Sequence, residues 1–154
     1  MTLIVTILWL LFGAGLAALF IWRAKQGSYN AYLQTVGIGL IVAALIYIAF
    51  AFIWGDFQWV LYESAGALIY TIIAVIGMRQ RSATMLAFGW LAHVLWDTLL
   101  HLWGPGHHIA PDWYAMACLS FDIVVALHIF TYKSLQHKTQ MPLNGEQLHA
   151  NSRD

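Results

Sequence analysis

Five long hydrophobic runs alternate with short polar segments along the chain. A helix that crosses a membrane needs roughly 20 predominantly apolar residues. Runs of about this length cover residues 2–22, 33–54, 58–78, 85–103 and 113–132. The pattern predicts an all-α fold in which residues 1–132 form a bundle of five transmembrane helices. The chain then turns polar, and we expect residues 133–154 to be a loosely ordered tail.

The basic residues predict the orientation of this bundle, because Lys and Arg gather in cytoplasmic loops. They occupy the first and third connections and the tail: Arg23, Lys25, Arg79, Arg81, Lys133, Lys138 and Arg153. The second and fourth connections contain no Lys or Arg. We therefore expect the N-terminus outside the cell and the tail in the cytoplasm. The first run lacks the basic start and cleavage site of a secretory signal, so we interpret it as a retained helix.

Composition agrees with a membrane location. The chain is 61% hydrophobic and only 9% charged, whereas soluble domains carry about 25% charged residues. Its net charge is zero and it has no basic stripe, which argues against a nucleic-acid partner. Its one cysteine, Cys118, excludes an intrachain disulfide and a zinc site built from several cysteines. We expect a multi-pass protein of a cell membrane, specifically a bacterial inner membrane. An oligomer or a completing partner subunit is compatible with the sequence.

The first two predicted helices look like scaffold. They carry small residues such as Gly13 and Gly39, which let helix backbones approach closely in lipid. The chemistry lies in the last three predicted helices: Glu63, His93, Asp97, His101, Asp122 and His128. Ionisable side chains within a membrane are rare and usually face a partner or a cavity.

Helical geometry predicts which of these groups lie close together. A rise of ~1.5 Å per residue places Glu63 and Asp97 about 8–9 Å below the outer interface, and His93 and Asp122 about 15 Å below it. His93, Asp97 and His101 recur every four residues, so neighbouring members share one helix face. The two histidines are about 12 Å apart along the axis, which is long for one ion held by both.

The charge of the carboxyl groups within the predicted helices favours a bound metal ion. Three carboxyl groups lie within the predicted helices without a Lys or Arg beside them, and a buried charge is unfavourable unless it is compensated. Protons, a histidinium or a metal ion would neutralise them. Imidazole and carboxylate together suit Zn²⁺, Fe²⁺, Mn²⁺ or Cu²⁺. We predict a divalent transition metal, with zinc expected first, and the candidate ligands are His93, Asp97, His101 and Asp122. One of the two histidines would bind the metal, and the other would lie in a second shell or a second site.

Other interpretations of these residues stay open. The His93–Asp97–His101 stripe would also serve as a hydrogen-bonded seam between helices, or as part of a proton or ion pathway. His128 faces a different side of its helix from Asp122, and we interpret it as a structural hydrogen-bonding residue. Cys118 reads as packing. The adjacent His107 and His108 of the fourth connection read as solvated loop residues, or as ligands that complete the site from above.

The stretch "GWLAHVLWDTLLHLWG" at 89–104, followed by "FD" at 121–122, resembles a family of small uncharacterised integral membrane proteins. The family pattern is a Gly-Trp opening, then His, Trp-Asp and His on one helix, and an Asp on a later helix. The matching positions are His93, Trp96, Asp97, His101 and Asp122. A looser likeness, in residue types alone, is to the alkaline ceramidase and adiponectin-receptor group of membrane hydrolases, which hold zinc with three histidines.

These observations predict metal-dependent hydrolysis of a lipid-like substrate. The metal would activate a bound water, and Asp97 or Glu63 would take its proton. The alternative is a non-enzymatic component of a transporter or membrane complex that handles metal ions or protons. A continuous pathway would need polar groups further towards the cytoplasm, where His128 is the candidate. A third possibility is a purely structural subunit.

Overall fold

The chain folds into long helices joined by short connections. The computed structural model describes the backbone of residues 2–151 and the side chains of residues 2–132. In chain order the elements are α1 (Leu3–Ala24), α2 (Tyr29–Trp54), α3 (Phe57–Arg79), α4 (Ala83–Asp97), the short π-helix η1 (Thr98–Leu102) and α5 (Asp112–Asn151). No strand occurs within residues 2–151. Five helical segments are long and apolar enough to cross a membrane, and the predicted all-α fold is confirmed.

Two features differ from a simple series of five α-helices. The fourth predicted helix is α-helical only to Asp97 and continues as a π-helix to Leu102. The fifth continues to Asn151, through the segment that we predicted as a loosely ordered tail. Residues 133–141 contain good helix formers such as Lys, Leu and Gln, and Gly and Pro are absent before Pro142.

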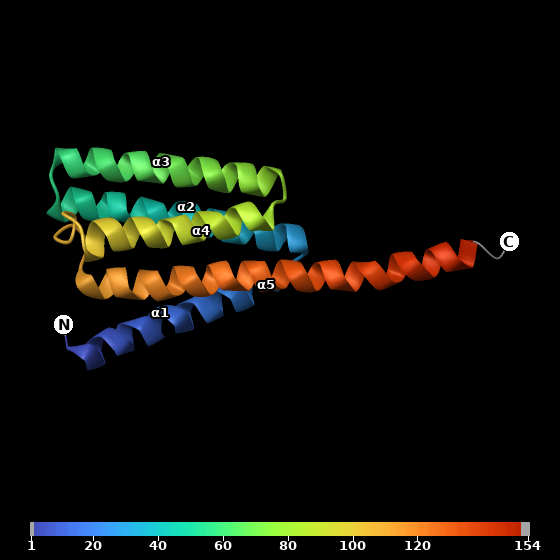
Figure 1. Cartoon of the computed structure of the whole chain (residues 1–154). Coiled ribbons are helices and arrows are strands. Elements are labelled where there is room, and N and C mark those ends of the chain that lie inside the picture. The colour runs from blue at the N-terminus through green and yellow to red at the C-terminus, as the bar shows by residue number, and fades with distance from the viewer. Residues whose placement is uncertain (1, 152–154) are drawn as a thin grey trace.

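Side chains in the short connections start three of the helices. The side-chain oxygens of Ser28, Asp56 and Ser82 accept hydrogen bonds from backbone N–H groups three residues later, at 3.2, 3.1 and 3.3 Å. Such N-caps satisfy donors that have no partner within the helix. The chain can therefore reverse direction in a few residues, which places consecutive helices antiparallel (Figure 1).

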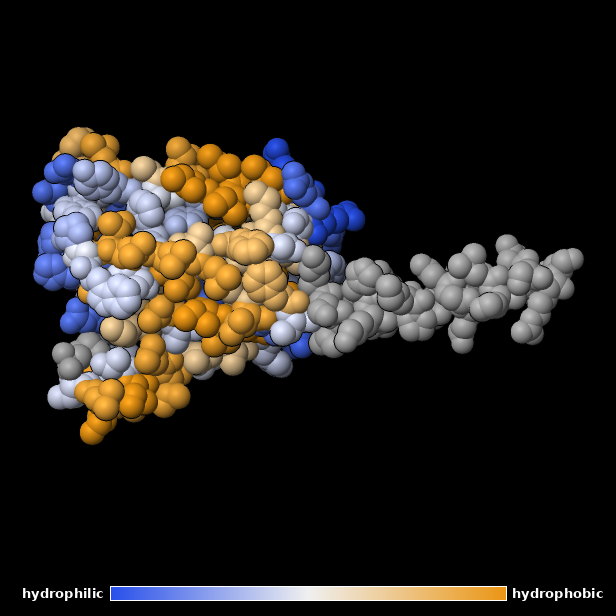
Figure 2. Space-filling view, in the orientation of Figure 1, coloured by the Kyte–Doolittle hydropathy of each residue, from blue (hydrophilic) through white to orange (hydrophobic). Residues whose placement is uncertain are grey.

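The helices form a bundle with α1 at its edge. α2 packs against α3, α4 lies beside α5, and α1 packs against α5 while barely touching α2 (Figure 1). We call the end that holds the loop 103–111 the histidine-loop end, and the opposite end, with Arg23, Arg79 and Arg81, the basic end. Hydrophilic residues gather at both ends and hydrophobic residues lie between them (Figure 2). This distribution fits a multi-pass integral membrane protein.

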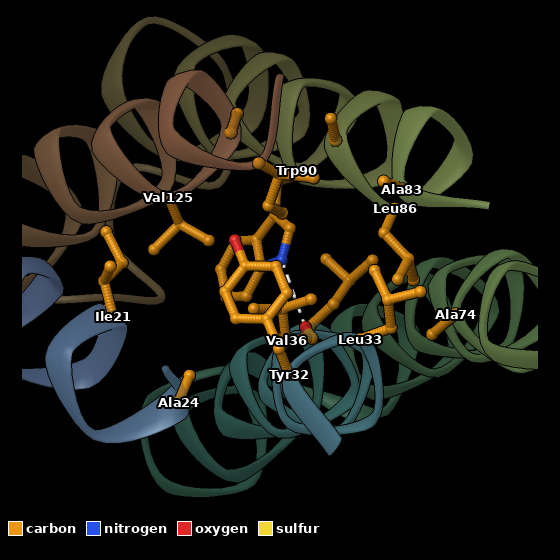
Figure 3. Packing of buried hydrophobic residues seen from close by; sticks show 14 of the residues in the cluster. Ile21, Ala24, Tyr32, Leu33, Val36, Ala74, Ala83, Leu86, Trp90 and Val125 are labelled. Atoms are coloured by element: carbon orange, nitrogen blue, oxygen red, sulfur yellow. Dashed lines mark hydrogen bonds between the residues drawn. The ribbon is translucent and has the colours of Figure 1, made fainter. Parts of the chain in front are cut away.

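Trp90 is the centre of the hydrophobic core. Its ring is fully buried, and its Nε1–H donates to the backbone carbonyl oxygen of Val36 at 3.1 Å (Figure 3). Buried residues of α2, α4 and α5 surround it, among them Leu33, Leu86 and Val125. Because Trp90 lies one helical turn before His93, this apolar core fills the bundle on the basic-end side of His93.

Gly13 allows α1 to contact α5. A Cβ atom at Gly13 would lie 2.0 Å from the carbonyl oxygen of Ala117 and 2.3 Å from Ser120 Oγ. Two residues further along α1, a Cβ at Gly15 would meet no atom within 4 Å. The predicted role of small residues in close helix approach is therefore visible at Gly13.

We predict that Gly13→Ala destabilises the bundle while Gly15→Ala does not. Alanine at 13 must push α1 away from a backbone carbonyl, an overpacking that costs about 1–3 kcal/mol. Alanine at 15 gains about 0.5–1 kcal/mol of helix propensity without a clash. Thermal unfolding of the two variants in the same detergent measures the difference, and equal midpoints would contradict the α1–α5 contact.

Candidate metal site

Four metal-ligating side chains converge between α4 and α5. His93 and Asp97 come from α4, and Cys118 and Asp122 come from α5. One ligand atom from each lies within 4.8 Å of the ligand atoms of the other three. His93 Nδ1 is hydrogen-bonded to Asp122 Oδ2 at 2.7 Å and lies 3.5 Å from Asp97 Oδ2. We call these residues the four-residue cluster.

Helix geometry explains why these residues meet. On each helix the two members are four residues apart, so their side chains project from the same face. The Cys118 thiol donates to Asp122 Oδ2 at 3.7 Å, a contact within a single helix. Since α4 and α5 lie side by side, the two pairs face each other.

The cluster contains more acceptor oxygens than donors. His93, Asp97 and Asp122 are at most 1% exposed. Within the described part of the chain, both Asp97 oxygens and Asp122 Oδ1 lack a hydrogen-bond partner. Buried polar atoms are nearly always satisfied, so these oxygens could accept a hydrogen bond from the nearby Tyr47 hydroxyl or Cys118 thiol, or bind a metal ion.

The spacing and charge of the cluster suit a divalent metal ion. Zinc binds oxygen, nitrogen and sulfur at about 2.0–2.3 Å in a tetrahedral arrangement, so the ligand atoms of one ion lie about 3.3–3.7 Å apart. The ligand atoms of the cluster, now within 4.8 Å of one another, would draw together by about 1 Å on binding. Two carboxylates with a neutral imidazole carry a charge of about −2, which one divalent ion balances, and Cys118 would add one further negative charge if it bound as a thiolate. The cluster could therefore hold a metal ion.

Aromatic rings enclose His93. The ring of Tyr70, from α3, lies edge-on to the imidazole with centroids 5.1 Å apart, and that of Tyr47, from α2, lies edge-on at 5.9 Å. Tyr70 Oη donates to the backbone oxygen of Ala92 at 3.0 Å, which fixes its position. Tyr47 Oη is buried and lies close to the Asp97 carboxyl group, without forming a hydrogen bond of good geometry. These rings restrict the orientation of the imidazole.

Glu63 and His101 form a second pair, between α3 and η1. His101 Nε2 lies 3.2 Å from Glu63 Oε1, an ion-pair distance without hydrogen-bond angles. Trp96 Nε1–H donates to Glu63 Oε2 at 3.3 Å. His101 Nδ1 lies 3.1 Å from the Gly106 carbonyl, which can only accept, so Nδ1 carries a proton. One further proton shared between His101 Nε2 and Glu63 would complete the pair.

The π-helix separates His101 from the four-residue cluster. The N–H of Trp103 donates to the Thr98 carbonyl, five residues earlier, at 3.1 Å. The wider turn rotates the residues of η1 away from the stripe that a continuous α-helix would give. His101 consequently faces Glu63, and the Tyr47 ring stacks on it with centroids 4.4 Å apart. Tyr47 thus contacts both His101 and His93.

The structure distributes the predicted site residues over these two groups. His93, Asp97 and Asp122 come together, while His101 pairs with Glu63 outside the four-residue cluster. Glu63 is 2% exposed and points inward. His107 and His108 are exposed in the loop. His128 lies towards the basic end, where its ring stacks on Tyr132.

Sequence reasoning interpreted Cys118 as packing, although it belongs to the four-residue cluster. Its position four residues before Asp122 was the available signal, because that spacing puts both on one face of a helix. It also treated α2 as scaffold and overlooked Tyr47. No spacing within α2 indicates that Tyr47 lies between two histidines of other elements.

The fold and site define a helical protein with a buried His/Asp/Cys cluster that could hold a metal ion, between two helices long and apolar enough to cross a membrane. The chain belongs to a family of unknown function, DUF6010, whose model matches residues 34–134. The matched range contains the four-residue cluster and the Glu63–His101 pair, and leaves out α1. No curated protein and no solved structure matches the chain. The resemblance to an uncharacterised family is confirmed, and the likeness to the ceramidase group receives no support.

We predict that His93→Ala strongly destabilises the metal-free protein. The substitution leaves the Asp97 and Asp122 carboxyl groups buried without their imidazole, and breaking a buried pair costs about 3–5 kcal/mol. His107→Ala is the control, because an exposed loop residue changes stability by about 0.5 kcal/mol or less. Thermal unfolding in the presence of a chelator measures both, and equal stability of the two variants would contradict the pairing.

Proposed function

We propose that the protein is a membrane metalloenzyme that binds one divalent transition metal, zinc first, in the four-residue cluster. The unpartnered, buried oxygens of Asp97 and Asp122 carry this proposal. One oxygen of each carboxyl group lies within 4.8 Å of a His93 nitrogen and the Cys118 sulfur, in a part of the chain with no Lys or Arg nearby in sequence. A bound cation supplies the missing partner and the missing positive charge together.

The proposed reaction is metal-dependent hydrolysis of a lipid-like substrate. A divalent metal in such a site polarises the scissile carbonyl and activates a water molecule. Asp97 is the preferred base, because neither of its oxygens makes a well-formed hydrogen bond in the structure, so that one could bind the metal and the other could accept the water proton. Glu63 is a weaker candidate, since Trp96 already occupies its Oε2. His93 and Asp122 would act as ligands, with Cys118 as a further ligand.

The alternative, a non-enzymatic component that handles metal ions or protons, meets an obstacle on one side of the cluster. Towards the basic end the interior is filled by Trp90 and its apolar neighbours. His128 is the nearest histidine there and is six residues from Asp122. A site closed on one side suits a reaction centre better than a pathway through the membrane. We place the histidine-loop end outside the cell, as the basic residues predict.

We predict that the purified protein contains close to one transition-metal ion per chain, by elemental analysis. His93→Ala and Asp97→Ala lose the metal, because each removes a ligand, whereas His107→Ala keeps it. Metal at about 100 times its dissociation constant stabilises the wild type by about 2.7 kcal/mol. Absence of metal in the wild type, with no thermal shift on adding zinc, would overturn the proposal.

Two further measurements refine the proposal. His101→Ala tests whether His101 is a metal ligand. A variant that retains the metal shows that His101 is not a ligand, and a variant that loses it indicates that His101 is one. Turnover of long-chain ester and amide substrates tests the reaction class, and a chelator should abolish it. A tightly bound metal without any such turnover would favour the non-enzymatic alternative.

A further inference from the structure

An apolar cleft leads from the side of the bundle to the four-residue cluster. It has a volume of about 630 Å³ and lies between α1, α2 and α5, with Trp90 of α4 also lining it. Its walls include Phe12, Leu16 and Phe20 of α1 and Ile38 and Val42 of α2. Ligand sites in proteins usually have volumes of about 300–1,000 Å³. The cleft is thus large enough for a small molecule.

The packing of α1 explains the opening. Gly13 holds α1 close to α5, and α1 barely touches α2, so the two helices leave a gap between them. Leu16 and Val42 on opposite walls are 43% and 49% exposed. Because the surrounding helix faces are apolar, this opening faces the lipid hydrocarbon in a membrane. A molecule dissolved in the bilayer could enter from the side without passing through water.

Two members of the four-residue cluster, Cys118 and Asp122, line the cleft. Asp122 is fully buried, and its Oδ1 has no hydrogen-bond partner within the described residues. Asp122 lies ten residues into α5, about 15 Å from the histidine-loop end and hence near the middle of a bilayer. Cys118 and Asp122 thus form part of the cleft wall next to the proposed metal site, with Cys118 8% exposed and Asp122 covered by its neighbours.

The charged residues that line the cleft indicate which charge a ligand's polar group can carry. Lys, Arg and His are absent from the lining residues, and Asp122 is the acidic one. An anionic headgroup at this depth would add a negative charge beside carboxylates that the metal only just balances, and a zwitterionic headgroup would lose the solvation of both its charges, which is strongly unfavourable. A small neutral group such as an ester, amide or hydroxyl avoids that penalty.

The length of the cleft matches that of one extended hydrocarbon chain. On α2 it extends from Thr35 to Ile46, which is about 16 Å of helix. That is about half of the ~30 Å hydrocarbon thickness, the depth of one leaflet. One extended hydrocarbon chain fits this length.

We propose that the cleft binds a neutral, single-chain lipid and delivers its polar group laterally to Asp122. This inference rests on the proposed function, since it names the substrate class of that site. It also assigns a role to α1, which lies outside the family match but forms one wall of the cleft.

Photolabelling in lipid nanodiscs tests the cleft, with a long-chain alcohol that carries a diazirine on its chain as the probe. We expect labels on cleft residues of α1, α2 and α5, removed by excess unlabelled alcohol. Val42→Trp fills the cleft and weakens the saturable labelling about tenfold, the change given by a loss of roughly 1.4 kcal/mol. Leu45→Trp is the matched control, because Leu45 is equally exposed on α2 but lies outside the cleft lining.

A second pair of variants makes the test independent of one substitution. Leu16→Trp should block the cleft from α1, whereas Leu19→Trp, exposed on the same helix outside the lining, should not. Equal labelling of blocked and control variants, or equal labelling of the cleft by a diazirine phosphatidylcholine, would overturn the inference. Metal content is measured on the same samples. If the wild type binds metal but shows no saturable labelling, the proposed lipid binding in the cleft is refuted while the proposed function stands. If the wild type contains no metal, the proposed function is refuted.

Discussion

The neutralisation of buried carboxyl groups is the constraint on which the rest of this structure depends. Glu63, Asp97 and Asp122 lie inside the bundle, each at most 2% exposed. Glu63 has a histidine and an indole N–H as partners. Asp97 and Asp122 share the single imidazole of His93, which leaves an excess of negative charge or of protons in the four-residue cluster. A divalent ion removes that excess without any other basic side chain.

The surrounding helices position the buried carboxyl groups and their histidine partners. Four-residue spacing on α4 and α5 places two ligand pairs face to face, and the π-helix after Asp97 turns His101 towards Glu63. π-Helical turns occur frequently at functional sites because they redirect side chains without ending a helix. Tyr47 then separates the two groups, since it packs against both His93 and His101. The two groups of ionisable residues are thus adjacent while each keeps its own set of partners.

Much of the architecture could be predicted from hydrophobicity, because a membrane span has a minimum length and an apolar composition. The convergence of His93, Asp97 and Asp122 followed from helical rise and matching depth. The distance between His93 and His101 followed from helical rise, but the pairing of His101 with Glu63 could not be predicted, since "DTLLHL" contains no signal that marks a π-helix. The participation of Cys118 required knowing which face of α5 meets α4. The opening beside α1 depends on how the helices pack, and helices of similar hydrophobic composition give no sequence signal for their packing partners.

Infrared difference spectroscopy tests most directly whether a metal ion neutralises Asp97 and Asp122. The metal-free protein should show the C=O stretching band of a protonated carboxylic acid, absent from Asp97→Asn combined with Asp122→Asn. Adding zinc should remove this band and produce the bands of metal-bound carboxylate. A carboxylic acid band that persists unchanged at saturating zinc would show that protons alone neutralise the pair, and would contradict the account.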